Sequence, residues 1–370
     1  VAATGYLALS GGNVATERAF IMVAVALCAI MVNRRAISLR AVAIAATIVL
    51  ILRPEALLGP GFQMSFAATT AFVAVFGFMR DERISFGPKW LQPVLGVLLA
   101  SGISGIATAP IGAAHFNAVS HYGLLANLLS VPVMGSVVVP AAVLALCLVP
   151  VGLDWIGLWI MGLGLRWILE VGAFVAGLDG ARSFVAGPSS SVLPMLTLGF
   201  LWVVLWQGRA RFAGIVPMLA AFAIWAITER PAALIAENGT LVGVMTDEGR
   251  ALSKAKGAGF IARNWLENDG DPSEQPYAAA LWRAENALVL RDGTRLRHLS
   301  GKRALAAFDG CTAGEIVVTS VAVGDLDTKG FGCEFYDPPR LRTMGALAIF
   351  ETEGGHRVTS VRDLTGARLW

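Results

Sequence analysis

Long apolar runs separated by short charged segments occupy the first 230 residues of this chain. An α-helix rises about 1.5 Å per residue, so about 20 apolar residues cross a hydrocarbon core of about 30 Å. Eight runs approach this length: Ala19–Val32, Ile37–Leu52, Phe62–Met79, Leu91–Pro110, Leu124–Leu148, Leu153–Leu178, Val192–Trp206 and Phe212–Ile227. The pattern predicts an α-helical polytopic membrane domain over residues 1–230, with about eight spans.

The pattern changes after residue 230. Short β-branched or apolar runs follow one another, and turn sequences such as Asp247-Glu248-Gly249 separate them. Five runs read as strands: Thr240–Met245, Ala287–Leu290, Glu315–Val323, Leu347–Phe350 and Val358–Val361. Residues 231–370 are numerous enough to bury a core of their own. We therefore expect an α/β, β-rich soluble domain after the membrane domain.

The distribution of charge supports this division. Only 15% of the 370 residues are charged, and they are spread unevenly. Residues 1–230 hold 13 Lys and Arg and 8 Asp and Glu, whereas residues 231–370 hold 16 and 18, giving net charges of +5 and −2. Neither part has the strongly basic balance of a protein that binds nucleic acid through bulk charge. A polyanion would have to be handled by local geometry.

The loop charges predict an orientation, because Lys and Arg collect on the cytoplasmic side of membrane proteins. The basic loops are Arg34-Arg35, Arg80–Lys89 and Arg209 to Arg211, and counting spans places all three on one side. The tail after residue 230 is then extracytoplasmic. An alternative stays open, in which the Trp-rich segment Leu153–Leu178 lies flat in the membrane interface and everything downstream is inverted.

Several short motifs in the membrane half resemble the competence domain of ComEC-type DNA-uptake channels. They are Ala15 to Met22, Arg53-Pro54-Glu55-Ala56-Leu57-Leu58, Gly61-Phe62-Gln63-Met64-Ser65-Phe66, and His115-Phe116-Asn117 through Asn127-Leu128-Leu129-Ser130-Val131-Pro132. The resemblance implies a channel in the bacterial inner membrane that passes single-stranded DNA during transformation. Complete members also have an OB-like domain and earlier spans, so we expect this chain to be N-terminally truncated.

The tail resembles the C-terminal region of proteobacterial members of this family. The resemblance rests on Trp265-Leu266, Cys311, Gly314 to Val318, Cys333, Leu341 to Ala346 and Arg368-Leu369-Trp370. Other members carry a metallo-β-lactamase-like domain there, with an H-x-H-x-D-H metal motif. That motif is absent, since the only histidines of the tail are His298 and His356. We therefore expect a degenerate metallo-β-lactamase-like fold without a metal or other cofactor.

Polar residues in or beside apolar spans are candidates for the DNA path, since a phosphodiester chain cannot shed its hydration into hydrocarbon. The candidates are Arg18, Gln63, Ser65, His115 and Asn127. For Ser and Asn the competing reading is hydrogen bonding between helices, and for Arg18 it is snorkelling to the interface. The spacing of His115 and His121 does not suit a metal site.

The partners follow from chemistry and from the resemblance. No G-x-x-x-x-G-K-[ST] phosphate loop occurs, so the force that pulls DNA must come from a separate cytoplasmic ATP-driven motor. The resemblance adds single-stranded DNA, an extracytoplasmic DNA-binding protein and the lipid bilayer, and it leaves a homo-oligomer open. Two other functions remain open: a membrane-anchored metal-dependent nuclease acting on incoming DNA, and a small-solute transporter.

The four cysteines fall into two classes. Cys28 and Cys147 lie in apolar spans and read as small hydrophobic residues. Cys311 and Cys333 both lie in the tail, 22 residues apart. The loop charges place the tail in the extracytoplasmic compartment, which is oxidising. We expect a disulfide between Cys311 and Cys333.

Overall fold

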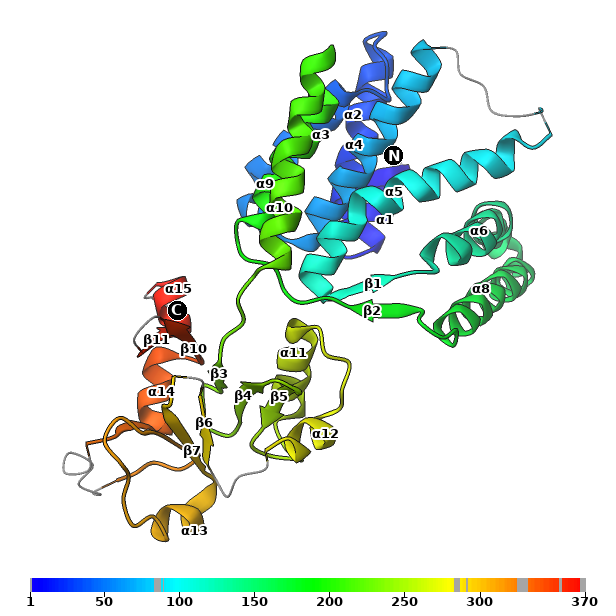
Figure 1. Ribbon diagram of the computed structural model, residues 1–370. Helices are drawn as coiled ribbons and strands as arrows, with labels where there is room; N and C mark the ends of the chain where they lie inside the picture. Colours follow the sequence, from blue (N-terminus) through cyan, green and yellow to red (C-terminus); the bar gives the residue numbers. More distant parts are fainter. Residues whose placement is uncertain are drawn as a thin grey trace. The chain divides into compact units, whose positions relative to one another are not determined.

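The computed structural model describes residues 2–82, 88, 90–282, 287–290, 292–324, 332–352 and 355–366. It divides into two compact units, and we describe each by itself. The membrane unit comprises residues 1–183 and 188–225, and the tail unit comprises residues 226–370 together with Phe184–Gly187. Figure 1 shows the first unit in blue to green and most of the second in green to red. Parts of the predicted Arg80–Lys89 loop and the closing Arg368-Leu369-Trp370 lie outside the described residues.

The membrane unit consists of helices (Figure 1). They are α1 (Ala2–Leu9), α2 (Val14–Met31), α3 (Leu39–Leu52), η1 (Pro54–Leu58), α4 (Pro60–Asp81), α5 (Gln92–Phe116), α6 (Gly123–Val133), η2 (Met134–Val138), α7 (Val139–Leu148), η3 (Val149–Val151), α8 (Asp154–Ala176), α9 (Val192–Leu205), η4 (Arg209–Gly214) and α10 (Ile215–Ala226). Two short strands, β1 (Ala118–Ser120) and β2 (Arg182–Phe184), pair with each other. Among the described residues, six helical segments are long and apolar enough to cross a membrane, and α3 and α9 are shorter apolar helices.

Local signals explain where several of these helices begin and end. The side chain of Asn13 accepts a hydrogen bond from the Ala15 amide at the start of α2, and Ser38 does the same for Ala41 at the start of α3. Asn117, with φ of 52°, ends α5 in the left-handed conformation. The sequence pattern ended this span at Pro110, but the helix continues through it to Phe116. Neighbouring helices can satisfy the backbone around a proline inside a membrane segment, and the continued helix has His115 in its last turn.

Small residues allow close helix packing in the second half of the membrane unit. A Cβ added at Gly164 of α8 would lie 2.7 Å from a methyl carbon of Val138, and one added at Gly157 would clash with the backbone of Ala145 in α7. Gly199 of α9 and Gly214 of η4 approach each other in the same way, with 2.6 Å from either added Cβ to the other carbonyl oxygen. Helices in lipid associate through such close contacts because no hydrophobic effect drives them together.

The tail unit combines sheets and short helices (Figure 1), and its described residues form two sheets and five helices. The five-stranded sheet has the order β11-β10-β3-β4-β5 and the four-stranded sheet the order β6-β7-β8-β9. The strands are β3 (Ala233–Ile235), β4 (Val242–Thr246), β5 (Gly249–Leu252), β6 (Ala287–Val289), β7 (Arg295–Leu299), β8 (Ile316–Thr319), β9 (Glu334–Tyr336), β10 (Leu347–Thr352) and β11 (Gly355–Ser360). The helices are α11 (Gly259–Asp269), α12 (Gln275–Ala280), α13 (Gly301–Ala306), α14 (Pro338–Met344) and α15 (Val361–Thr365).

One hydrophobic core joins the two sheets of the tail. It includes Ile235 and Val244 from the first sheet and Leu296 and Val318 from the second, all nearly inaccessible to solvent. The first sheet is antiparallel, whereas β7, β8 and β9 run parallel. The predicted fold class, a helical membrane domain followed by an α/β domain rich in strands, is therefore confirmed.

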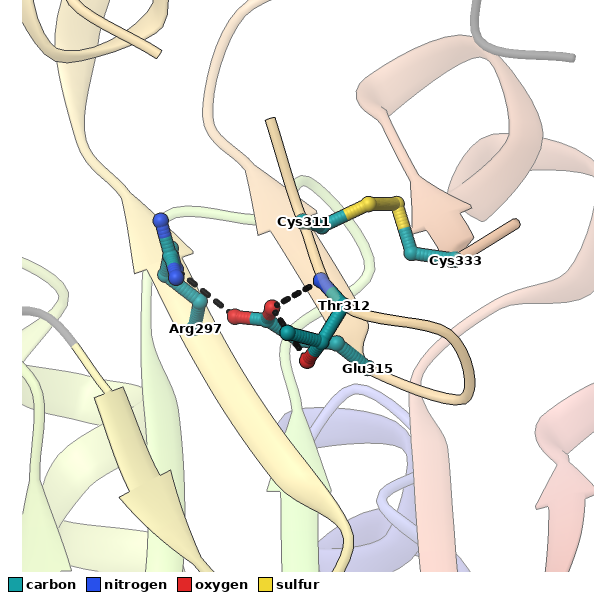
Figure 2. The surroundings of a disulfide bond; sticks show 5 residues. All are labelled: Arg297, Cys311, Thr312, Glu315 and Cys333. Atoms are coloured by element: carbon teal, nitrogen blue, oxygen red, sulfur yellow. Dashed lines mark hydrogen bonds and ion pairs between the residues drawn. A yellow bond between two sulfur atoms is a disulfide. The ribbon is translucent and has the colours of Figure 1, made fainter. Parts of the chain in front are cut away.

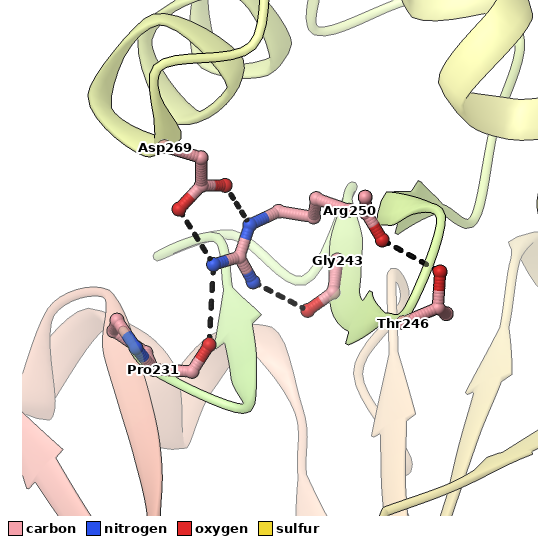
Figure 3. Close-up of polar contacts among 6 residues, drawn as sticks. Pro231, Gly243, Thr246, Arg250 and Asp269 are labelled. Carbon is pink, nitrogen blue, oxygen red and sulfur yellow. Dashed lines mark hydrogen bonds and ion pairs between the residues drawn. The ribbon is translucent and has the colours of Figure 1, made fainter. Parts of the chain in front are cut away.

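A fully buried arginine supports the first sheet from within (Figure 3). Arg250 of β5 donates two hydrogen bonds to the carboxylate of Asp269 at the end of α11, and the Arg250 side chain is 0% exposed. The guanidinium also donates to the carbonyl oxygens of Pro231, at 3.1 Å, and Gly243, at 3.4 Å. These bonds tie α11, β4 and the segment before β3 to one side chain.

The segment Phe184–Gly187, which precedes α9 in the chain, belongs to the tail unit. The amide of Gly187 donates to the carbonyl oxygen of Asn268 over 2.8 Å. Gly270, with φ of 77°, lies so close that an added Cβ would be 2.8 Å from the Ala186 nitrogen. This segment contacts the rest of the tail, although α9 and α10 lie between the two in the sequence. If α9 and α10 each cross a membrane, the segment and the rest of the tail therefore lie on the same side of it.

Candidate functional site

Polar side chains from four helices meet at one end of the membrane unit. Both α2 and α4 begin at this end, and both α3 and α5 finish there. Glu17 at the start of α2 forms an ion pair with Arg53 at the end of α3, with 2.9 Å between Oε2 and Nε. Gln63 at the start of α4 is hydrogen bonded to His115 in the last turn of α5. We call the following residues the motif cluster: Glu17, Arg18, Arg53, Gly61, Gln63 and His115.

The amide of Gln63 uses both of its ends. Its Nε2 donates to the carbonyl oxygen of Leu57 in η1 over 2.9 Å, and its Oε1 lies 2.9 Å from Nε2 of His115. Since Oε1 can only accept, the proton of the neutral imidazole must be on Nε2. Nδ1 of His115 is then left as a hydrogen-bond acceptor. The pair connects two motifs that are 52 positions apart in the sequence.

Arg18 lies against the backbone of α4 at Gly61. A Cβ added to Gly61 would be 2.5 Å from Nη1 and 3.2 Å from Cζ of Arg18, so only glycine allows this approach without moving the guanidinium. Within the described residues, Nε of Arg18 is buried and has no hydrogen-bond partner. Glu17 forms its ion pair with Arg53, and among the described residues no ion pair of Arg18 is seen, so the motif cluster holds two arginines to one glutamate.

Two predicted site residues lie outside this network. Ser65 is half-buried on α4, and its carbonyl oxygen accepts a hydrogen bond from the Thr69 hydroxyl. Asn127 is exposed on α6, and its side chain makes no hydrogen bond within the described part of the chain. Of the five candidates, the structure therefore brings Gln63 and His115 into contact, places Arg18 on the same helix ends, and does not join Ser65 or Asn127 to them.

A second polar pair joins β1 and β2. Nε2 of His121 lies 2.7 Å from the hydroxyl oxygen of Ser183, and the His121 amide donates to the carbonyl oxygen of Ala181 over 3.1 Å. Nearby, the Tyr122 hydroxyl donates to the carbonyl oxygen of Asp179 over 3.3 Å. The sequence pattern did not indicate Ser183, because a lone serine 62 positions from its partner carries no local signal.

The two histidines of the tail have different surroundings. His298 on β7 is buried, and its Nε2 lies 3.0 Å from the carbonyl oxygen of Gly239. His356 on β11 has Nδ1 3.5 Å from the carboxylate of Asp292 and 3.4 Å from the Thr294 hydroxyl. No group of three or more His, Cys, Asp or Glu side chains with metal-binding geometry occurs among the described residues.

We expect His298 to make the tail sensitive to acid. Burial, the largest cause, lowers the pKa of His298 from 6.5 to about 4, against the hydrogen bond to Gly239. Between these values the unfolded chain binds a proton that the folded chain does not, so stability falls as pH drops from 6.5 towards 4. Thermal unfolding of the tail within the full chain, followed at pH 7.5 and 4.5, measures this.

The variant His298→Gln removes the titrating group and should flatten the acid side of that stability profile, since its amide can still donate to Gly239. His356→Gln is the matched control and should keep the wild-type loss. An acid loss of equal size in wild type and His298→Gln would show that other groups cause it.

The structure pairs the two cysteines of the tail (Figure 2). Cys311 precedes β8 and Cys333 precedes β9, so the disulfide joins the starts of neighbouring parallel strands, with 6.2 Å between the Cα atoms. Beside it, buried Glu315 accepts hydrogen bonds from Nε of Arg297, at 2.7 Å, and from the amide of Thr312, at 3.0 Å.

Comparison with known proteins identifies the membrane unit. A family model described as "Competence protein" matches residues 1–210, which is more than half of the chain. The chain is therefore a multi-pass membrane protein of the competence protein family. It is similar to ComE operon protein 3 of Bacillus subtilis (strain 168), with 24% identity over 202 residues, covering 54% of this chain and 25% of that protein.

The tail has no such assignment. The family match ends at residue 210, and no solved structure matches the chain. The chain also spans only about a quarter of the length of the curated relative. The α/β architecture is established, and its kinship with metallo-β-lactamases stays a prediction from the sequence.

Proposed function

We propose that this chain is an inner-membrane channel component that passes single-stranded DNA into the cell during natural transformation. The observation that carries the proposal is the motif cluster. Side chains from four helices of a competence-family membrane unit meet at one end, and among the described residues the buried Nε of Arg18 has no hydrogen-bond partner. A polar site of this kind in apolar helices is costly, and it is a functional candidate by default.

The distribution of charge favours an outward-facing cluster. The motif cluster lies where α2 and α4 begin, so the loop after each of these helices lies at the opposite end. Those loops carry Arg34 and Arg35 after α2, and Arg80, Arg83 and Lys89 around the end of α4. Since basic loops remain in the cytoplasm, the cluster would face the compartment from which DNA arrives. By the same count, the tail would be extracytoplasmic.

The chemistry of the cluster suits a passing phosphodiester. A guanidinium hydrogen bonds phosphate oxygens strongly, and Nδ1 of His115 can accept a hydrogen bond from the water that accompanies the strand. The contacts among Gln63, His115 and Leu57 would fix the width of the opening through which the strand enters the membrane unit. No residue here supplies energy, so the strand would be pulled by a separate cytoplasmic ATP-driven motor and presented by an extracytoplasmic DNA-binding protein.

We expect Gln63→Leu to reduce DNA entry about tenfold or more, the equivalent of losing a hydrogen bond of about 1.4 kcal/mol in the polar entry. The measurement is DNase-protected labelled DNA in cells whose only copy is the variant, with surface-bound DNA and the amount of membrane protein recorded in parallel. Arg18→Gln should act in the same direction. Gly61→Ala should reduce DNA entry as Arg18→Gln does, because the new methyl group displaces the guanidinium of Arg18. Asn127→Leu tests the candidate that lies outside the cluster.

The matched control is Gln92→Leu, the same change on an exposed side chain at the opposite end of α5. It should insert and transport normally. If Gln63→Leu and Arg18→Gln insert and take up DNA like wild type, the cluster only packs helices and the proposed entry is wrong. If uptake of a small solute falls instead of DNA uptake, the transporter reading replaces the channel.

A further inference from the structure

Two charged residues lie near the middle of α8, a helix long and apolar enough to cross a membrane. Arg166 comes 12 residues after Asp154, the first residue of α8, and 10 residues before Ala176, the last. Glu170 follows Arg166 by four residues, about one helical turn. Both residues are exposed, and within the described part of the chain neither side chain forms an ion pair. Ionisable residues this deep in a membrane segment are rare, and each is a candidate for function.

The neighbour of α8 indicates that both helices cross the membrane. The helical segment Gly123–Val151, which includes α6 and α7, has 29 residues, a mean hydropathy of 2.3 and no charged side chain. The helix α8 packs against it in the opposite direction, with Gly157 beside Ala145 and Gly164 beside Val138. An apolar helix pair of this length spans the hydrocarbon core, which places the two charges near its centre. Snorkelling to the interface serves side chains near helix ends, so it does not relieve this position.

The two charges lie on the side of α8 away from its packing face. That packing face carries Gly157, Gly164 and Val171, which are buried and recur every seven residues. Arg166 comes two residues after Gly164, which is about 200° around a helix of about 3.6 residues per turn. Trp159, which is 63% exposed, lies on the same outer side. If lipid covered this side, a positive and a negative charge would lie in hydrocarbon, which is costly even for a pair.

We propose that the outer face of α8, which comprises Trp159, Gly162, Arg166 and Glu170, lines a water-filled passage inside the membrane. Water solvates charges of both signs, and charged residues of membrane helices face such cavities. A second copy of the chain suits this face less well, because a symmetry axis normal to the membrane would set each Arg166 at the depth of the other.

The outer face of α8 has one charge of each sign, so it offers no net attraction to a polyanion. Its role is to keep the wall of the passage hydrated at mid-depth. This inference rests on the proposed function in one respect, because it takes this passage as the one that the strand uses. A phosphodiester chain needs a hydrated wall along its whole path, since it cannot shed its hydration into hydrocarbon.

The test measures how fast single cysteines in cells react with a charged methanethiosulfonate that does not cross membranes. The full chain carries Cys28→Ala and Cys147→Ala, and peptide mass spectrometry locates each modification. Gly162→Cys and Ala173→Cys place a thiol on the outer face of α8 before and after the two charges. An added Cβ at Gly162 has no neighbour within 4 Å, so the new side chain fits. Both thiols should react, because a thiol must ionise in water to become a nucleophile.

The matched control is Val139→Cys on α7. Val139 is 53% exposed, and the contacts between α7 and α8 set it within about one residue of the depth of Gly162. It lies among apolar residues, so its thiol should react at least about tenfold more slowly than that of Gly162→Cys. Adding Arg166→Leu and Glu170→Leu should slow the Gly162→Cys reaction to the control rate, because the charges hold the water. Reaction after denaturation verifies that each thiol is present.

Equal rates at Gly162→Cys and Val139→Cys would overturn the inference, because lipid, protein or the membrane surface would then cover both helices alike. A fast reaction that survives the loss of both charges would reject the role of Arg166 and Glu170. The uptake measurements on the motif cluster are independent of these rates. Equal thiol rates with reduced uptake in Gln63→Leu would remove the passage along α8 and leave the channel proposal. A fast Gly162→Cys reaction with normal uptake in Gln63→Leu would keep the passage and reject the proposed entry.

Discussion

Asp269→Ala should destabilise the tail by about 3–5 kcal/mol, the usual effect of removing one partner from a buried ion pair. The Arg250 side chain is 0% exposed and that of Asp269 is 7% exposed, so the guanidinium would remain in the protein interior without its counter-charge. The carbonyl oxygens of Pro231 and Gly243 would still accept hydrogen bonds, but they carry no net charge. Urea unfolding of the full chain, followed by protease sensitivity of the tail, measures the loss.

Two further variants separate charge from packing. In the double variant Arg250→Met with Asp269→Leu neither charge remains, and it should recover much of the stability, because apolar residues of similar volume can replace a buried pair. Asp271→Ala is the matched control, since Asp271 caps the Ser273 amide at 2.8 Å near the surface and its loss should cost about 1 kcal/mol. Asp269→Ala within 1 kcal/mol of wild type would mean that the interior adapts and that this pair is not central to the tail.

The sequence predicted the membrane unit better than the tail. A run of apolar residues long enough to cross a bilayer is a strong signal, and each of the eight predicted runs coincides with helix in the structure. In the tail, all five predicted strands overlap observed ones, but β3, β5, β7 and β9 were missed. The sequence of β7 shows why, because Arg295 and Arg297 alternate with residues of the buried face and give the strand the composition of a loop. Its neighbours β6 and β8 on either side determine its structure.

The candidate site was predictable as a set of residues and not as an arrangement. Gln63 and His115 could be selected because each is a polar residue in an apolar segment with a recognisable motif. Their hydrogen bond could not, since it depends on how α4 and α5 pack. The position of Arg18 likewise depends on the missing side chain of Gly61, which is 43 positions away in the sequence but adjacent in space. Asn127 shows the opposite case, because its motif is clear and it lies outside the cluster.

The second large effect concerns Cys311 and Cys333. A bridge closing a loop of about 20 residues stabilises a domain by roughly 3 kcal/mol in the chain-entropy picture, a large share of the typical 5–15 kcal/mol. In the tail the bridge also lies next to a buried network, since Thr312 follows Cys311 and donates to Glu315, which pairs with Arg297. Loss of the bridge would loosen the start of β8, where this network is anchored (Figure 2).

Cys311→Ser should therefore destabilise the tail by about 3 kcal/mol, and Cys333→Ser and the double variant should do the same, because each removes the same bond. Cys147→Ser, at an exposed position in α7, should leave the stability of the tail unchanged. Chains isolated from cells without reductant and treated with a thiol reagent should react at Cys28 and Cys147 after denaturation, and at neither tail cysteine. Alkylation of both tail cysteines in native membranes would contradict the bridge. It would also weaken the extracytoplasmic assignment of the tail, because thiols in the cytoplasm remain reduced.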